Sequence, residues 1–457
     1  MDTYDFVVIG GGPGGYVAAI RASQLGYSVA IVEKEETLGG VCLNWGCIPT
    51  KSLLKSAEVY NTLKSAEHFG FKVGNIELDL AQIVRRSREA VSKLAAGVSS
   101  LMKKHNIKVH RGIARLSGNK VVSVEQDKER VDLSAKHIIL ATGSSARSIP
   151  GLDKEILWTA REAMLPETLP ESLLIIGTGA IGVEFASFYA TLGSKVSMVE
   201  LQERMLPLED RAVSEFMLKN FQGRGVDVYT GSSVSEVKCN GPVMETVILG
   251  SGSEKKIRCD KIISAVGVQP NTKGLGIENT KIKADTAGFI IVDEYCRTDE
   301  PGIYAIGDVS GAPCLAHKAS HEATICVDKI AEAEGTLDRK VHPLVKDNIP
   351  SCIYSIPQVA SVGLTEESAR AQGFQVKVGN FPANCSGKAV ASGEVEGFVK
   401  VVLDETTGEL LGAHMVGTEV TEMIHGYVVC KQLEGTSLDI ASTVFPHPTL
   451  SEMMHEA

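Results

Sequence analysis

Residues 6–15 read FVVIGGGPGG, and this stretch decides the fold of the first part of the chain. The apolar run predicts a buried strand, and a helical pattern follows over residues 16–25. Gly10, Gly12 and Gly15 have the spacing G-x-G-x-x-G, in which the glycines allow a tight turn, the approach of a pyrophosphate and close helix packing. The helix N-terminus supplies free N–H groups to the phosphates. The stretch therefore predicts a dinucleotide-binding loop.

The same pattern occurs a second time in the chain. Residues 173–182 read LLIIGTGAIG and precede a helical pattern over residues 183–192. The glycines of this copy are Gly177, Gly179 and Gly182. One such motif is weak evidence, because glycines often serve simple turns. Two copies, each between an apolar strand and a helix, strongly indicate two dinucleotide sites.

An acidic residue ends the second strand of each copy. Glu33 and Glu200 each lie eighteen residues after the third glycine. Such a carboxylate accepts hydrogen bonds from both hydroxyls of an adenosine ribose and repels a 2′-phosphate, so Glu200 favours NAD over NADP. Two sites indicate one bound flavin and one exchangeable nicotinamide. We call residues 6–33 the first fingerprint and residues 173–200 the second fingerprint.

The composition of the chain bounds its class. The 457 residues, 44% of them hydrophobic, predict two to four domains. A net charge of −10 argues against non-specific nucleic-acid binding, and no apolar run approaches the roughly 20 residues of a membrane span. A strand-like run at residues 6–9 leaves no room for a targeting peptide, and most of the ten cysteines are scattered singly. We expect a cytoplasmic protein in a reducing compartment, without nucleic-acid or membrane partners.

Three more strand ends complete the expected nucleotide sites. Residues 137–143 and 261–267 each run from a strand into a glycine, and we expect both to close a nucleotide-binding half. Asp308 ends the run 302–308, where ligands of open α/β sheets bind, and can accept a flavin ribityl hydroxyl. The alternative for Asp308 is a plain helix N-cap. The remaining expected cofactor contacts are Thr142, Gly143, Gly267, Gly112 and Ala316.

Residues 40–51 read GVCLNWGCIPTK and place Cys42 and Cys47 five positions apart. In a regular helix their Cα atoms would be roughly 8.5 Å apart, whereas a disulfide needs about 4.4–6.8 Å. A bridge therefore requires a distorted helix, which Gly46 permits, and a strained, accessible bridge is readily reduced. A helix N-terminus and a cation such as Lys51 favour a thiolate. We favour a redox disulfide over two unrelated thiols or a metal site, because no further metal ligand lies at short spacing.

Residues 445–452 read FPHPTLSE, near the end of the chain. Prolines stiffen the backbone around His447, and Glu452 lies about one helical turn further on, where it can accept the ring N–H. Chemistry that breaks and forms disulfides needs a base for a thiol proton, and we predict that His447 is this base. A rigid turn also favours a cis His447–Pro448 bond. His317 is the strongest rival base.

Together these motifs resemble the pyridine-nucleotide disulfide oxidoreductases. The resemblance covers the whole chain in order, from the first fingerprint and the cysteine motif to Tyr304–Asp308 and His447–Glu452. Within the family, the chain resembles members that oxidise protein-bound dihydrolipoamide to lipoamide with NAD⁺. The residues that carry this resemblance are Glu200 and the segment Leu315–Ala319. The dipeptide Val268-Gln269 departs from the pattern, since relatives commonly have an arginine here.

The resemblance implies the cofactors and the assembly. FAD is expected at the first fingerprint, tightly bound with one per subunit, and NAD at the second. A homodimer is expected, in which His447 and Glu452 reach the active site of the partner subunit. Lys51 is then expected near the flavin, with Glu184 as its neighbour.

The resemblance also implies the domain organisation. We predict an α/β fold with two Rossmann-like dinucleotide-binding domains and a C-terminal α+β dimerisation domain. The predicted boundaries are 1–145 for the FAD-binding domain, 146–274 for the NAD-binding domain, 275–345 for a central domain that completes the FAD site, and 346–457 for the dimerisation domain.

The expected partners are the lipoyl domain and acyltransferase core of a 2-oxo acid dehydrogenase complex, or a lipoylated glycine-cleavage carrier protein. The sequence does not choose between these complexes. Three other functions stay open at this point: reduction of a different low-molecular-weight disulfide, an NADH:acceptor reductase that does not use the disulfide, and a flavin-bearing binding subunit.

Overall fold

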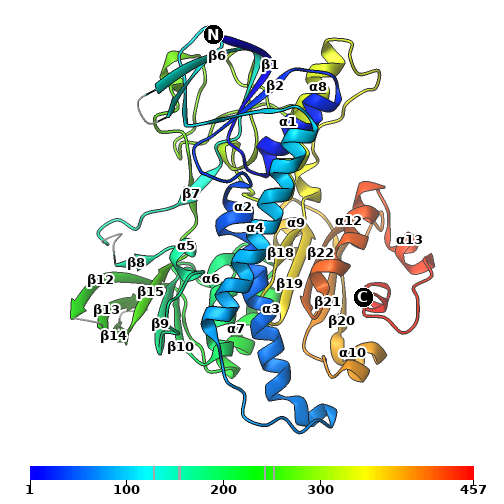
Figure 1. Ribbon diagram of the computed structural model, residues 1–457. Coiled ribbons are helices and arrows are strands. Elements are labelled where there is room, and N and C mark those ends of the chain that lie inside the picture. Colours follow the sequence, from blue (N-terminus) through cyan, green and yellow to red (C-terminus); the bar gives the residue numbers. More distant parts are fainter. Residues whose placement is uncertain (127–128, 153–155, 241–242, 251–252) are drawn as a thin grey trace. The chain divides into compact units, whose positions relative to one another are not determined.

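The structure is a computed structural model that describes residues 1–457 except 127–128, 153–155, 241–242 and 251–252 (Figure 1). The described residues form two compact units, each discontinuous in sequence. Unit 1 comprises residues 1–52, 84–147 and 267–344, and unit 2 comprises residues 53–83, 148–266 and 345–457. This division differs from four contiguous domains, whose boundaries remain a prediction.

Unit 1 is built on a seven-stranded sheet with the order β3-β2-β1-β6-β5-β4, in which β17 also pairs with β6. The pairs that involve β1, β2, β3 and β17 are parallel, and β4 and β5 add an antiparallel edge. The strands are β1 (Asp2–Ile9), β2 (Val29–Glu33), β3 (Lys108–Arg111), β4 (Ile113–Leu116), β5 (Val121–Gln126), β6 (Glu129–Leu140) and β17 (Ile303–Ala305). A separate ribbon pairs β7 (Ser144–Ala146) with β16 (Val268–Pro270).

Two long helices of unit 1, α1 (Pro13–Gln24) and α8 (Ala316–Ala333), pack against each other. Helix α1 begins three residues before the predicted start, because proline is well tolerated in a first helical turn. The other helical elements are α2 (Gly40–Trp45), η2 (Ile277–Asn279) and η3 (Gly307–Ser310), and the helices α3 (Cys47–Lys64) and α4 (Leu80–Lys104) contribute residues to both units.

Unit 2 contains the second fingerprint in a parallel sheet with the order β11-β10-β9-β15-β8. The strands are β8 (Leu157–Trp158), β9 (Ser172–Ile176), β10 (Lys195–Val199), β11 (Asp227–Tyr229) and β15 (Lys261–Ser264), and the helices are α5 (Ala160–Ala163), α6 (Ala180–Leu192) and α7 (Arg211–Gly223). An antiparallel sheet follows, with β12 (Ser232–Asn240), β13 (Val243–Gly250) and β14 (Ser253–Cys259).

The C-terminal part of unit 2 is an antiparallel sheet with the order β18-β19-β22-β21-β20. Its strands are β18 (Ser351–Ile353), β19 (Gln358–Gly363), β20 (Val376–Pro382), β21 (Phe398–Asp404) and β22 (Leu410–Gly417). The helical elements of this C-terminal part are η4 (Lys346–Asn348), α9 (Glu366–Ala371), η5 (Ala383–Cys385), α10 (Gly387–Ser392), α11 (Val420–Met423), α12 (His425–Gln432), α13 (Ser437–Ser442) and α14 (Glu452–Glu456). Unit 2 also contains the short element η1 (Ala66–Phe69). The predicted α/β class, with two Rossmann-like parts and a C-terminal α+β part, is confirmed.

Candidate active site

The glycines of the first fingerprint hold strand β1 and helix α1 in close contact. Gly10 has a φ of +107°, and a Cβ atom added there would lie 2.2 Å from the carbonyl oxygen of Ala141. A Cβ atom on Gly15 would lie 1.8 Å from the carbonyl oxygen of Gly10. Only glycine fits at these two positions, so the loop leaves the N–H groups at the start of α1 accessible to an anion. This geometry fits a dinucleotide pyrophosphate.

The second fingerprint repeats this geometry in unit 2. Gly177 has a φ of +102°, and its added Cβ would lie 2.4 Å from the carbonyl oxygen of Ala265. An added Cβ on Gly182 would lie 2.0 Å from the carbonyl oxygen of Gly177. Helix α6 begins directly after Gly179, as α1 begins after Gly12.

Each strand-end carboxylate is buried and bonded to its own glycine loop. Glu33 accepts hydrogen bonds from the N–H of Gly11 at 2.7 Å and the N–H of Glu35 at 2.9 Å. Glu200 accepts hydrogen bonds from the N–H of Thr178 at 2.8 Å and the N–H of Gln202 at 3.0 Å. Thr178 also donates its hydroxyl to Glu200 at 2.9 Å. Both acids thus lie where the adenosine ribose of a bound dinucleotide is expected.

The remaining predicted contacts of the first site lie in unit 1, with Asp308 in η3 and Ala316 at the start of α8. Asp308 accepts a hydrogen bond from the Ser144 hydroxyl at 2.6 Å, and η3 has no side-chain N-cap, which disfavours the N-cap reading. Thr142 donates its hydroxyl to the carbonyl of Asn271 at 2.9 Å. Gly143, Gly267 and Gly112 have positive φ angles of 68°, 94° and 139°.

The helix is interrupted between the two cysteines, which is the distortion that a bridge between them would require. Helix α2 ends at Trp45, and α3 begins at Cys47, so Gly46 alone separates them. No disulfide joins Cys42 to Cys47 in the described structure. A hydrogen bond with Cys47, burial and the charge of Cys47 raise the pKa of the Cys42 thiol, whereas Lys51 lowers it. Cys42 therefore keeps its proton at neutral pH.

Two neighbours of this pair were not predicted. Burial and the charges of Cys42 and Cys47 raise the pKa of Tyr16 on helix α1. Arg88 on α4 donates to the carbonyl of Asn44 at 2.9 Å and lies over the Trp45 ring, so a cation interacts with the last turn of α2. Tyr16 lies in the first fingerprint but not at one of its glycines, and Arg88 lies in no motif, so only the fold reveals these contacts.

The predicted acid–base pair lies together in unit 2. Nδ1 of His447 lies 2.8 Å from Oε1 of Glu452, and the His447–Pro448 bond is cis, as predicted. Hydrogen bonds from the N–H of Thr449 and from His447 lower the pKa of Glu452. The Glu452 carboxylate therefore stays ionised and orients the His447 ring. The His447 side chain is 78% exposed. The other ring nitrogen, Nε2, is available to a substrate.

Lys51 and Glu184 belong to different units, and their predicted contact remains a prediction. Within unit 2, Glu184 lies on α6 and accepts a hydrogen bond from the N–H of Tyr354 at 2.9 Å. Among the described residues, no group of three or more Cys, His, Asp or Glu side chains has an arrangement that would hold a metal ion.

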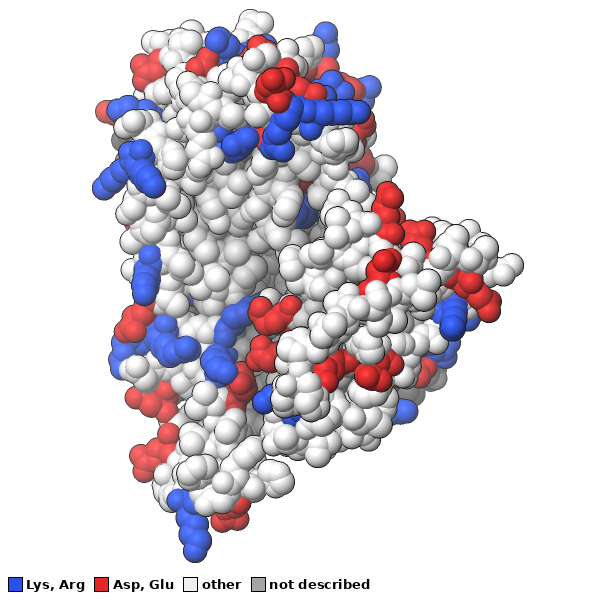
Figure 2. Space-filling view, turned by 90° about the vertical axis from the view of Figure 1, so that its right-hand side faces the viewer, with Lys and Arg blue, Asp and Glu red and all other residues white. Residues whose placement is uncertain are grey.

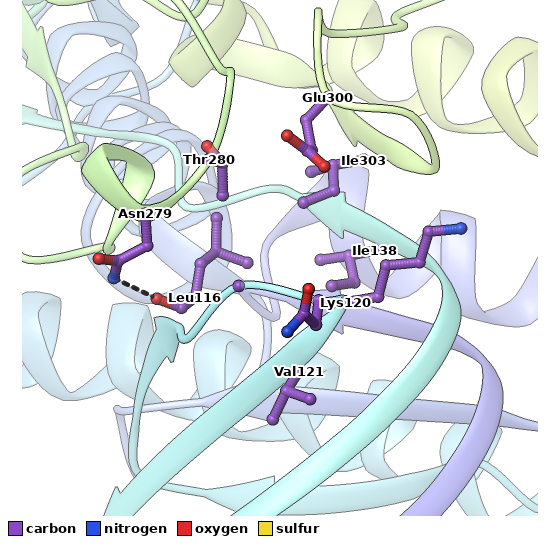
Figure 3. Close-up of a pocket in the computed structure, with 10 residues that line it drawn as sticks. Leu116, Lys120, Val121, Ile138, Asn279, Thr280, Glu300 and Ile303 are labelled. Atoms are coloured by element: carbon purple, nitrogen blue, oxygen red, sulfur yellow. Dashed lines mark hydrogen bonds between the residues drawn. The ribbon is translucent and has the colours of Figure 1, made fainter.

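A small pocket in unit 1 is lined in part by Ile138 and Ile303, from two of the predicted strand ends, but by none of the predicted site residues (Figure 3). It is lined by the β4–β5 turn and by segments near residues 279 and 300, and Asn279 donates to the carbonyl of Leu116 at 2.9 Å beside it. None of the residues that line it belongs to a fingerprint or to the cysteine motif.

Apolar side chains are exposed near the C-terminal helices. Leu433, Leu438 and Val444 are exposed, and uncharged residues cover much of the face shown in Figure 2. Among the described helices, none combines the length and the apolarity that a membrane crossing requires.

Comparisons with known proteins place this geometry in one family. Residues 4–323 match the family model described as pyridine nucleotide-disulphide oxidoreductase, and residues 349–457 match the dimerisation domain of the same family. The chain belongs to this family, whose members contain FAD and use a pyridine nucleotide. Membership of this family confirms the predicted cofactors, FAD and NAD, and the dimerisation domain supports the predicted homodimer.

Curated relatives match along their whole length. The chain is 50% identical to a dihydrolipoyl dehydrogenase of Zymomonas mobilis over all of this chain and 97% of the relative, and 44% identical to one of Bacillus subtilis over 99% and 97%. Among solved structures, LpdA of Mycobacterium tuberculosis is similar with a TM-score of 0.91 and 26% identity over 100% of this chain and 99% of that one.

Proposed function

We propose that this protein oxidises protein-bound dihydrolipoamide to lipoamide and transfers the electrons through FAD to NAD⁺. The observation that carries the proposal is the Cys42–Cys47 pair, held across a helix break with a cation nearby, in a chain that is 50% identical to a dihydrolipoyl dehydrogenase. The buried Glu200 supports NAD as the nucleotide, since its charge would repel a 2′-phosphate.

The cofactor sites follow from the two fingerprints. Gly10, Gly12, Gly15 and Glu33 would hold the adenosine diphosphate part of FAD, and Asp308 its ribityl chain. Further contacts would come from Lys51, Gly112, Thr142, Gly143 and Ala316 on the FAD side, and from Gly177, Gly179, Gly182, Glu184, Glu200 and Gly267 on the NAD side. When bound, FAD supplies the two-electron transfer between the enzyme dithiol and the nicotinamide.

The protein's own residues carry out the thiol chemistry. Each subunit contributes His447 to the site of its partner, and Nε2 removes a proton from one substrate thiol while Glu452 holds Nδ1. The substrate thiolate attacks Cys42 of the enzyme disulfide, so the Cys42–Cys47 bond breaks and Cys47 leaves as thiolate. The second substrate thiol then displaces Cys42, which releases the cyclic disulfide product and leaves the enzyme as a dithiol.

The expected setting is a cytoplasmic homodimer that serves a lipoyl-bearing complex. The lipoyl group would be presented by a 2-oxo acid dehydrogenase complex or by a lipoylated glycine-cleavage carrier protein. The exposed apolar side chains near α12 and α13 support the homodimer.

Anaerobic reduction with one equivalent of dihydrolipoamide tests the proposal. We expect a long-wavelength absorbance band from the Cys47 thiolate beside the oxidised flavin, and we expect Cys47→Ser to abolish it. In the reverse direction, with NADH as the reductant, other disulfides should be reduced more slowly than lipoamide. If NADH reduces the flavin while dihydrolipoamide does not, the nucleotide half of the proposal stands and the substrate assignment is wrong.

A further inference from the structure

Two charged side chains on helix α8 are buried and have no role in the chemistry above. Lys318 is 2% exposed, and its ammonium lies 3.2 Å from the carboxylate of Glu322, one helical turn further on. A buried charge pair is expensive, because both ions lose their hydration, and apolar side chains of similar size would pack without that loss.

The pair is attached to the turn that carries Asp308. Nζ of Lys318 donates to the carbonyl of Gly307 at 3.1 Å and to the carbonyl of Gly311 at 2.8 Å. Glu322 accepts a hydrogen bond from the N–H of Gly307 at 2.7 Å. The two side chains therefore fix both ends of residues 307–311, which we call the Asp308 turn.

The location of Lys318 is electrostatically unusual. Lys318 lies in the first turn of α8, where the helix dipole is positive and a cation is disfavoured. Glu322 and two carbonyls offset this repulsion locally. The result is a buried ammonium, paired with Glu322 and shielded from water, at the helix end where the predicted contact Ala316 lies.

The charges of this region also act on a neighbouring thiol. Burial and the charge of Asp308 raise the pKa of Cys314 to about 11, and Lys318 opposes that rise. Asp308 likewise contributes to the raised pKa of Cys42. Asp308 thus acts on both Cys314 and Cys42, and Lys318 acts on Cys314.

We propose that Lys318 and Glu322 form a positioning pair that fixes the Asp308 turn and adjusts the reduction potential of the flavin. This inference rests on the proposed FAD site at Asp308 and Ala316. Reduction adds negative charge to the flavin, so the ammonium of Lys318 favours the reduced form and the carboxylate of Glu322 favours the oxidised form.

The two charges predict opposite shifts, which a purely structural role does not. In the full-length holoenzyme, Lys318→Met should lower the flavin potential and Glu322→Gln should raise it. We expect each to change the reduced-to-oxidised ratio at a fixed potential about three- to tenfold, where tenfold corresponds to about 30 mV for two electrons. The measurement is equilibrium reduction against a redox dye of known potential.

A matched control lies on the same helix. Lys329 forms a 2.8 Å pair with Glu332 on the C-terminal half of α8 and is more exposed, so Lys329→Met should leave the ratio within about twofold of wild type. The dye measurement requires no dihydrolipoamide. A different physiological substrate would therefore leave this result unchanged, and the two proposals can fail separately.

Several outcomes would overturn the inference. One is a Lys318→Met enzyme that retains FAD with an unchanged potential, and another is a shift of both variants in the same direction. If Lys318→Met is purified without FAD, the flavin potential of Glu322→Gln tests the inference alone. A raised potential supports it, and an unchanged or lowered potential contradicts it. Loss of FAD from both variants would indicate a purely structural pair.

Discussion

The two fingerprints share one framework, and they differ in what the chain does next. Gly39 donates its N–H to the carbonyl of Gly11 at 2.7 Å in unit 1, and Leu206 donates its N–H to the carbonyl of Thr178 at 3.3 Å in unit 2. These contacts occupy equivalent positions, because Leu206 follows Glu200 by the same interval as Gly39 follows Glu33. The repeat therefore extends beyond the acid into the loop that returns to the glycines.

After this loop the first copy inserts helix α2, and the second copy does not. Gly40, the first residue of α2, is so close to Gly12 that a Cβ on Gly12 would lie 3.7 Å from its Cα atom. A Cβ on Gly179, the equivalent of Gly12, would meet no atom of the described residues within 4 Å. One site is covered by the segment that carries Cys42, whereas the other stays open. This difference suits a resident cofactor in the first copy and an exchangeable one in the second.

The largest effects should come from alanine at the third glycine of each fingerprint. Gly15→Ala forces a Cβ to within 1.8 Å of a backbone carbonyl in the covered site, which we expect to cost about 3 kcal/mol or more. The purified protein should lack FAD, and both half-reactions should be lost. Gly182→Ala should retain FAD and its reduction by dihydrolipoamide, and should lose turnover with NAD⁺. Absorbance of the purified proteins and anaerobic titration distinguish these results; equal loss of FAD from both variants would contradict the division of roles.

A change at the catalytic base should separate the half-reactions again. His447→Gln removes the group that we propose accepts the thiol proton, so we expect dihydrolipoamide oxidation to fall about 10²- to 10⁴-fold. NADH-driven reduction of an artificial acceptor should change little, because it needs no thiol base. His317→Gln is the control and should have a much smaller effect on dihydrolipoamide oxidation. The reverse order of the two histidines in steady-state kinetics would mean that the base is wrongly assigned.

The two strand-end acids should differ in what their loss does. Glu200→Gln removes the charge that we propose binds the ribose. Since a hydrogen bond to a charged group contributes about 1.5–3 kcal/mol, KM for NAD⁺ should rise about ten- to a hundredfold. The value of kcat should change less. Glu33→Gln should still be purified with FAD, because Leu38 and Gly40 cover the first site. A Glu33→Gln protein that loses FAD as readily as Glu200→Gln loses NAD⁺ would remove the distinction between covered and open sites.

The sequence predicted the repeated parts of the molecule well, because glycine spacing and strand-end acids are local signals with a narrow physical cause. The break between Cys42 and Cys47 and the pairing of His447 with Glu452 were also predictable, since helix geometry and short sequence separation constrain both. The contacts of Ser144 with Asp308 and of Lys318 with the Asp308 turn were not predicted. They join segments distant in sequence or backbone atoms whose positions depend on the folded turn, so residue types alone do not specify them.

The smallest effect concerns the residue that precedes the apolar run of each fingerprint, Asp5 in the first and Ser172 in the second. Asp5, before Phe6 of β1, pairs with Lys136 at 2.6 Å and accepts hydrogen bonds from Ser28, whereas the equivalent Ser172 donates its N–H to Asp260 at 2.9 Å. Partial burial would raise the pKa of Asp5, but hydrogen bonds from Lys136 and Ser28 lower it to about 2. Its folded pKa lies below the unfolded value, so its contribution to stability is present above pH 4 and is lost as the pH falls through about 2.

Asp5→Asn should therefore destabilise unit 1 at pH 7 by about 0.5–1 kcal/mol, the range of a solvent-screened ion pair. The difference from wild type in urea unfolding should shrink as the pH is lowered toward 3 and as salt is added, because both changes weaken the charge interaction. Asp260→Asn is the counterpart in unit 2, where Asp260 accepts backbone N–H of Ser172 instead of pairing with a lysine. Its effect should depend less on salt. Equal salt dependence of the two variants would show that Asp5 and Asp260 stabilise their strands alike.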